Sequence, residues 1–180
     1  MSAKKRILIA AEKLFTTKGY ENVSVREIAK EADTSHTSIY VYYKTKWQLL
    51  VSLAAPPLEQ LLHELKQDMS LVEVAKHYVR FGLVHRHLYE LYITFHGSRV
   101  DEESEDFLNQ IRIQLFEQLR TILSSETTKD ADTLLLTRIL FFQLHGTIMT
   151  YVNSEEDFET IGARVMPLVE VAVEKIVRGE

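Results

Sequence analysis

Residues 23–50 contain the feature that most constrains this fold, two short apolar-periodic segments separated by a polar break. Each segment is shorter than the ~12 residues that an isolated helix needs in water, so both must pack against neighbours. The first segment begins with a capping box, in which Ser24 takes the N-cap position and Glu27 follows three residues later. Ser35 can cap the second segment, and Asp33 tolerates a turn conformation between them. The stretch therefore predicts two packed helices joined by a tight turn.

The rest of the chain also has helical periodicity. Pro56 and Pro57 predict a kink or a boundary within residues 46–68. No β-hairpin signal, repeat or low-complexity tract occurs. We therefore expect an all-α protein of about nine helices. The expected helices beyond the first two segments lie in residues 7–18, 46–68, 71–85, 88–95, 107–123, 134–152 and 158–177.

Length and composition exclude several classes of protein. The 180 residues, 46% of them hydrophobic, suffice for a substantial core. The absence of cysteine excludes a disulfide framework and cysteine-based zinc or thiolate chemistry. The start of the chain does not read as a signal peptide. The most apolar window, residues 139–152, is shorter than the ~20 residues of a membrane span. We expect a cytoplasmic protein without a membrane partner.

Charge is distributed unevenly along the chain. Residues 1–50 carry nine Lys and Arg against five Asp and Glu, whereas residues 51–180 carry twelve against twenty-one. The first segment therefore has a net charge of +4 and the second a net charge of −9. Such an asymmetry indicates that one part meets a polyanion, although a merely solvated basic surface would look the same.

The two short helices have the pattern of a helix-turn-helix, a motif whose second helix lies in the DNA major groove. Short polar side chains lead this second helix, Ile39 and Tyr43 can face the core behind it, and tyrosines and lysines flank it. We predict that the side chains contacting DNA bases are those of Arg26, His36, Thr37 and Ser38. The side chains predicted to contact the DNA backbone are those of Ser24, Tyr40, Tyr42, Lys44 and Lys46.

Residues 7–50 resemble the N-terminal DNA-binding domain of the TetR family of bacterial transcriptional repressors. The resemblance is carried by the segments AAEKLFTTKGY, VSVREIAKEA and TSIYVYYKTKWQLL. Asp33 and Thr34 stand where that family usually has Gly and Val, and His36 and Thr37 stand where Lys and Gly are common. These departures bear on the operator sequence rather than on the fold.

The later segments VRFGLVHRHLYELYITFHGS and LFFQLHGTIMTY are similar to the regulatory domain of a TetR subgroup with a W-H-G signature, in which Leu144 here replaces the tryptophan. The resemblance implies a DNA-binding domain in residues 1–46, and a domain for ligand binding and dimerisation in residues 47–180. It also implies a homodimer built from the last two long helices. The helix expected in residues 134–152 supports the homodimer independently, because a helix that is apolar on nearly all sides must be covered on several of them. Some of the candidates for the dimer seam must instead belong to the core. The candidates are Leu140, Leu144, Ile148, Phe158, Ile161, Val165, Leu168, Ala172 and Ile176.

A ligand cavity in a helical body should be lined mostly by apolar and aromatic groups, with a few polar groups that orient the guest. Tyr92 and His145 are the strongest candidates, because their polar tips need partners if they are buried. The same residues could instead simply fill the core. The full set of candidates, which favours a flat or greasy effector, is Phe81, His85, Leu88, Tyr92, Phe95, Ile111, Leu115, Phe141 and His145.

Metal and catalytic chemistry are not indicated. His85 and His87 lie about 200° apart on a helix, so they cannot share a metal from one face. The acidic run at residues 101–106 lacks the spacing and the glycine of a calcium loop, and it suits the N-terminus of the next helix. We find no catalytic constellation, and we expect no cofactor, no metal and no enzymatic activity.

The sequence thus predicts a homodimeric, ligand-responsive transcriptional regulator, most simply a repressor of a palindromic operator in double-stranded DNA. In the mechanism that the resemblance implies, a small apolar or aromatic effector shifts the helix in residues 46–68 and changes the distance of about 34 Å between the two recognition helices. The alternative is a helical carrier or enzyme that binds a small molecule and whose basic N-terminal region is incidental.

Overall fold

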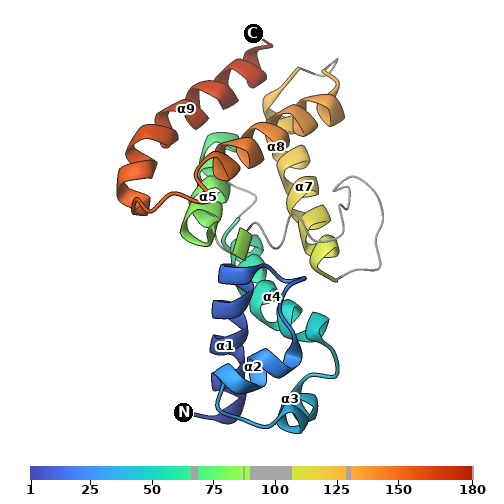
Figure 1. Ribbon diagram of the computed structural model, residues 1–180. Helices are drawn as coiled ribbons and strands as arrows, with labels where there is room; N and C mark the ends of the chain where they lie inside the picture. Colours follow the sequence, from blue (N-terminus) through green and yellow to red (C-terminus); the bar gives the residue numbers. More distant parts are fainter. Residues whose placement is uncertain (66–68, 87, 90–106, 129–130, 180) are drawn as a thin grey trace.

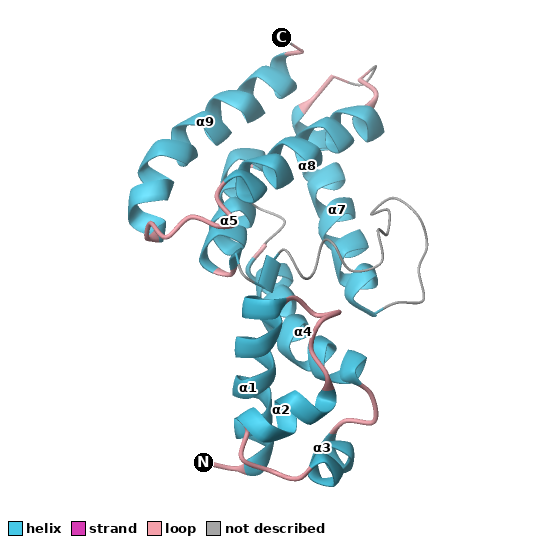
Figure 2. Ribbon diagram, in the orientation of Figure 1, coloured by secondary structure: helices cyan, strands magenta, loops and turns pink. Residues whose placement is uncertain are grey.

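The computed structural model describes residues 1–65, 69–86, 88–89, 107–128 and 131–179. These residues form eight helices and no strand, so the all-α prediction is confirmed (Figures 1 and 2). Most of the helix expected in residues 88–95 lies outside the described residues. The helices are α1 (Ala3–Lys18), α2 (Val25–Glu31), α3 (His36–Tyr42), α4 (Lys46–Glu64), α5 (Leu71–Val84), α7 (Phe107–Glu126), α8 (Thr133–Thr150) and α9 (Phe158–Arg178).

Helices α1 to α3 pack together as a small head below the other helices in Figure 1. Their buried side chains include Phe15 from α1, Ile28 from α2 and Ile39 from α3. Gly19 ends α1 with a φ of 79°, a backbone conformation that glycine adopts without the steric cost other residues pay. The chain therefore turns sharply after α1, which places α2 across it.

Helix α4 belongs to both parts of the molecule. Its first turns pack against α1, and it also packs against α7 and α5 in the body. Pro56 and Pro57 lie inside this helix, which continues through both of them to Glu64. The domain boundary predicted between residues 46 and 47 thus falls within the first turn of a shared helix, and it stays a prediction. Helix α4 therefore connects the head directly to the body.

The body is built around α5, which packs against α4, α7, α8 and α9. Helices α8 and α9 lie at the end of the molecule that is farthest from α3 (Figure 1). Gly82 on α5 allows a close approach to α8, where it faces the side chain of Ile148. Within the described ranges, no helix combines the length and the apolar character that crossing a lipid bilayer requires.

Candidate functional site

Helices α2 and α3 both begin with a side-chain cap. Ser24 Oγ accepts from the backbone N–H of Glu27 at 3.2 Å, and the backbone N–H of Ser24 donates to Glu27 Oε2 at 2.9 Å. Ser35 Oγ accepts from the backbone N–H of Ser38 at 3.0 Å. Asp33, in the turn, has a φ of 47°, a left-handed conformation that aspartate tolerates better than most residues. The capping box and cap predicted from the sequence are therefore present, and they determine where α2 and α3 begin.

Helix α3 presents a continuous exposed face at the end of the head that points away from the body (Figure 1). His36, Thr37, Tyr40 and Val41 are all exposed on it, and Ile39 anchors the opposite face in the core. The rings of His36 and Tyr40 meet edge to face, with centroids 4.9 Å apart. A short helix held from behind, with its polar N-terminal turn exposed, has the form that a DNA major groove accepts.

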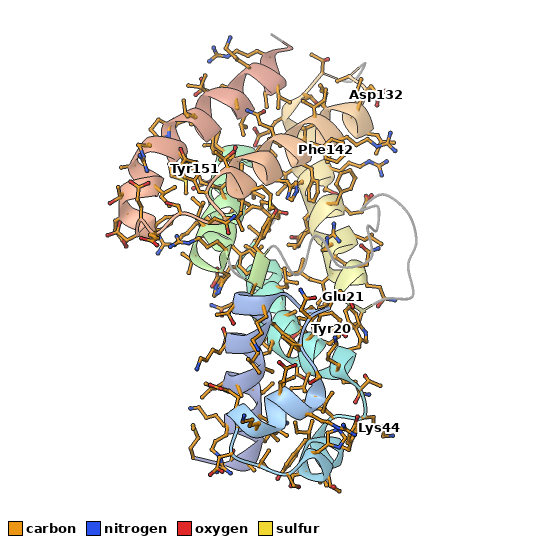
Figure 3. All side chains as sticks on the ribbon, in the orientation of Figure 1. Tyr20, Glu21, Lys44, Asp132, Phe142 and Tyr151 are labelled. Carbon is orange, nitrogen blue, oxygen red and sulfur yellow. The ribbon has the colours of Figure 1, made fainter. Side chains whose placement is uncertain are left out.

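The residues that follow α3 divide between the surface and the core. Tyr42 and Lys44 are exposed, and Figure 3 shows Lys44 beside α3. Tyr43 is buried, so the core interpretation that the sequence favoured for this residue is confirmed. The backbone N–H of Lys44 donates to Gln48 Oε1 at 2.8 Å, which ties this flank to the first turn of α4.

The side chain of Lys46 is placed differently from that of Lys44, the other lysine that follows α3. Its ammonium donates to the carbonyl oxygens of Tyr20 at 2.8 Å and Val23 at 3.1 Å, and it lies 4.1 Å from the centroid of the Tyr20 ring. This side chain therefore holds the loop between α1 and α2 against the start of α4. The structure gives Lys46 an internal role that the sequence did not reveal, and its predicted phosphate contact stays a prediction.

The core of the body contains a line of hydrogen-bonded polar side chains. Tyr78 Oη and Tyr89 Oη are 3.0 Å apart, and Tyr89 Oη is 3.1 Å from His145 Nδ1. Burial raises the pKa of both phenols, so both hydroxyl groups stay protonated near neutral pH. Burial and the nearby charge of Arg112 lower the pKa of His145, which favours its neutral form. His145 thus has an internal hydrogen-bond partner, and its contact with an effector stays a prediction.

A small cavity of about 10 Å³ lies beside this polar line, which is room for about one water molecule. Three predicted effector residues line it, namely Phe81, Leu115 and Phe141. His85 lines a separate groove between α4 and α5, and its role toward an effector stays a prediction. Leu88 and Ile111 are buried, and Tyr92 and Phe95 lie outside the described residues. The remaining residues that line the cavity are Leu58, Tyr78, Tyr89 and Arg112.

A larger cleft, of about 590 Å³, opens between α4 and α7. Leu58 of α4 lines the small cavity, and Leu62, one helical turn further along, lines the cleft. On α7, Leu115 lines the small cavity, and Gln118, about one helical turn further along, lines the cleft. Residues of α4 and α7 therefore line both the cleft and the cavity, and the cavity is lined in addition by residues of α5 and α8. The lining of the cleft consists of Leu62, Leu65, Gln114, Glu117, Gln118, Thr121, Ile122 and Ser125.

The candidates for the dimer seam divide into exposed and buried residues. Leu168 is exposed, and Phe158, Ala172 and Ile176 are partly exposed. The other five predicted residues are buried within their own chain because α8 and α9 turn these faces toward α5 and toward each other, so they cannot form a surface seam. These five are Leu140, Leu144, Ile148, Ile161 and Val165.

A different set of apolar side chains is exposed on the same two helices. Leu135, Ile139 and Phe142 follow one another at helical spacing along α8, and Phe142 is 64% exposed on the outer side of that helix (Figure 3). Leu168, 66% exposed, and Val171 form a shorter stripe on α9. We call these five residues the outer apolar face.

Models of known protein families match almost the whole chain in two parts. The model described as bacterial regulatory proteins of the tetR family matches residues 7–53. The model described as a tetracyclin repressor-like C-terminal domain matches residues 71–176, more than half of the chain. The chain belongs to the TetR family. The predicted DNA-binding transcriptional regulator is thereby confirmed, and the carrier or enzyme alternative is not favoured.

Individual relatives extend this TetR assignment over the full length. The fatty acid metabolism regulator protein of Bacillus subtilis is 23% identical over 172 residues, which cover 87% of each chain. The crystal structure of the regulator FadR from Bacillus subtilis, in complex with stearoyl-CoA, has a TM-score of 0.63 at 21% identity, covering 98% of this chain and 99% of that one. A transcriptional regulator from Aquifex aeolicus has a TM-score of 0.72 at 19% identity, covering 97% and 99%.

Several candidate residues of this TetR-family chain could not be found from its sequence. Val41 is 75% exposed on α3, although an apolar residue in an amphipathic helix usually faces the core. Its methyl groups suit contact with a thymine methyl in the major groove. Tyr78, Tyr89 and Arg112 carry no motif, and only the packing of α5, α7 and the residues after α5 brings them together. The signal available for Val41 was its position four residues after Thr37.

The capping box makes the stability of the head depend on pH in the acid range. The backbone N–H of Ser24 and the ammonium of Lys18 lower the pKa of Glu27 to about 2, from an ordinary value of 4.5. The carboxylate therefore stabilises the folded state above about pH 4.5, and this contribution is lost as the pH falls toward about 2. As the pH falls through this window, we expect the free energy of unfolding to decrease less for Glu27→Gln than for the wild type. Urea unfolding at several pH values and one protein concentration measures this free energy. Equal slopes of the free energy of unfolding against pH in the two proteins would contradict the prediction.

Proposed function

We propose that this TetR-family protein is a homodimeric repressor that leaves its operator when a long-chain acyl compound binds in its body. The observation that carries the proposal is the match along 87% of both chains with a fatty acid metabolism regulator. A structural neighbour over nearly the full length holds stearoyl-CoA. An acyl chain also satisfies the original expectation of a greasy effector, because it is an apolar guest for an aromatic cavity.

The proposed DNA contacts follow from the exposed surface of the head. His36, Thr37 and Val41 on α3 would face base edges, and Tyr42 and Lys44 would contact phosphates on one flank. Arg26 on α2 is exposed and stays a candidate for a base contact. The hydroxyl of Ser38 lies 2.7 Å from Ser35 Oγ, so its first role is within the cap.

The homodimer would form through the outer apolar face of α8 and α9, in the bacterial cytoplasm where the operator lies. Exposed leucine, isoleucine and phenylalanine side chains at helical spacing favour packing against a second copy of the same helices. Gly146 continues the stripe after Phe142, and its position has no neighbouring atom within 4 Å, which leaves room for a partner helix. A symmetric pair would present two α3 helices to one palindrome.

Release by the effector would act through α4. The cleft lies between α4 and α7, and residues of both helices also line the cavity. The start of α4 is tied to the head through Lys46 and Gln48. The cavity of about 10 Å³ is too small for an acyl chain, so a guest must move helices apart to enter. A complete switch requires the effector to prefer the released state by about 5.5 kcal/mol.

Fluorescence anisotropy with the DNA upstream of the protein's own gene tests this function. We expect sequence-specific binding that stearoyl-CoA reverses. Lys44→Ala should weaken binding to operator and random DNA alike and reduce the slope of log K against log salt by about one. Binding without sequence preference would favour the carrier or enzyme alternative, and operator binding that stearoyl-CoA leaves intact would contradict the acyl effector.

A further inference from the structure

The outermost line of α3 is occupied by two side chains that carry methyl groups. Ile39 is buried and fixes the inner face of this helix. Thr37 and Val41, two residues before and two residues after it, each lie about 160° around the helix axis from Ile39, because successive residues are about 100° apart. Both side chains are exposed, and four residues separate them, so they are neighbours on one line of the helix. We call Thr37 and Val41 the methyl ridge.

Polar side chains flank the methyl ridge on both sides. His36 and Tyr40 lie on one flank, where their rings meet edge to face with centroids 4.9 Å apart. Ser38 and Tyr42 follow the other flank, again four residues apart. Apart from the hydroxyl of Thr37, the side-chain groups of α3 that can hydrogen-bond to DNA therefore lie beside the ridge. The part of the helix that enters a groove first is apolar.

An apolar ridge has a preferred partner among the bases. Each base presents hydrogen-bonding groups in the major groove, and thymine alone adds an apolar one, its C5 methyl. A valine methyl over a hydrogen-bonding group would displace water without replacing the hydrogen bond, which has a cost in free energy. Against the C5 methyl, the same contact removes apolar surface from water on both partners. Val41 is also branched at Cβ, which restricts its rotamers in a helix, so it loses little freedom on contact.

We propose that Thr37 and Val41 determine operator specificity by each contacting the C5 methyl of one thymine in every half-site. The inference rests on the proposed binding of the operator through α3. Four residues of helix rise by about 6 Å. Successive bases of one strand are about 3.4 Å apart, so the two thymines lie one or two base pairs from each other. The phosphate contacts proposed for Tyr42 and Lys44 would hold α3 in place without reading sequence.

Replacement of thymine by uracil tests the proposal, because the two bases differ only in the C5 methyl. Fluorescence anisotropy with the full-length protein uses the DNA upstream of its own gene, with each thymine of the bound site replaced in turn in one half-site. In the wild type we expect two positions per half-site, one or two base pairs apart, at which uracil weakens binding by about fourfold. Val41→Ala should reduce this loss to less than about 1.5-fold at one position, and Thr37→Ser should do so at the other.

Val84→Ala is the matched control. Val84 is also an exposed valine, but it ends α5 in the body, so its replacement should leave every ratio of thymine to uracil affinity as in the wild type. Val41→Ala should fold, because the side chain is exposed and alanine favours a helix.

Two results would overturn the role of the methyl ridge while the proposed repressor stands. The first is sequence-specific binding by the wild type with no position sensitive to uracil. The second is a loss of affinity in Val41→Ala and Thr37→Ser that is equal for the thymine and uracil sites. Binding of the wild type without any sequence preference would instead overturn the proposed operator binding and this inference together.

Discussion

Replacement of Phe142 by aspartate should convert the protein into a monomer and weaken operator binding at least about a hundredfold. The Phe142 side chain is 64% exposed at the centre of the outer apolar face, and a carboxylate there would have to be desolvated against a second copy. Two linked DNA-binding heads gain about a hundredfold or more in affinity over one head, and a monomer forfeits this gain. Sedimentation velocity at micromolar concentration and anisotropy with the operator measure both effects.

The matched control for this prediction is Phe107→Asp. Phe107 is 44% exposed at the first residue of α7, away from α8 and α9. An acidic residue at a helix N-terminus is favourable, so this variant should stay folded and dimeric and should bind the operator normally. A folded Phe142→Asp variant that remains dimeric would show that the outer apolar face is not the seam.

Gly82→Ala should destabilise the fold by about 1–3 kcal/mol, although alanine normally stabilises a helix relative to glycine. A Cβ at residue 82 would lie 2.7 Å from Ile148 Cγ1 and 2.8 Å from Ile148 Cγ2, and closer still to Cδ1. The whole Ile148 side chain, which is fully buried, would have to move, and so α5 and α8 would separate. Chemical denaturation at a fixed protein concentration measures the loss.

A double-mutant cycle isolates the cause. Ile148→Ala removes all three atoms that the new Cβ would meet, so Gly82→Ala should cost much less in that background than in the wild type. Gly146→Ala, on the same helix as Ile148, places a Cβ where no atom lies within 4 Å, and it should not destabilise a single chain. Equal costs of Gly82→Ala in both backgrounds would exclude the close approach of α5 and α8 as the reason.

The head could be predicted from the sequence in detail because its signals are local. Ser24, Glu27 and Ser35 act on backbone groups within three residues, so their pattern determines where α2 and α3 begin. Ile39 and Tyr43 are buried as their spacing predicts. The role of Lys46 could not be predicted in the same way, because its partners lie 26 and 23 residues earlier and meet it only after α1 and α4 have packed.

In the body the sequence determined that helices form, and tertiary structure decided which of their faces are inside. Helix α8 is apolar on nearly all sides, so periodicity alone could not separate a core face from an outer face. The docking of α5 and α9 buries Leu140 and Leu144 and leaves Ile139 and Phe142 exposed, which moves the proposed seam by a fraction of a helical turn. The polar line of Tyr78, Tyr89 and His145 has the same origin, because hydrogen bonds between side chains on different helices depend on packing that no local pattern encodes.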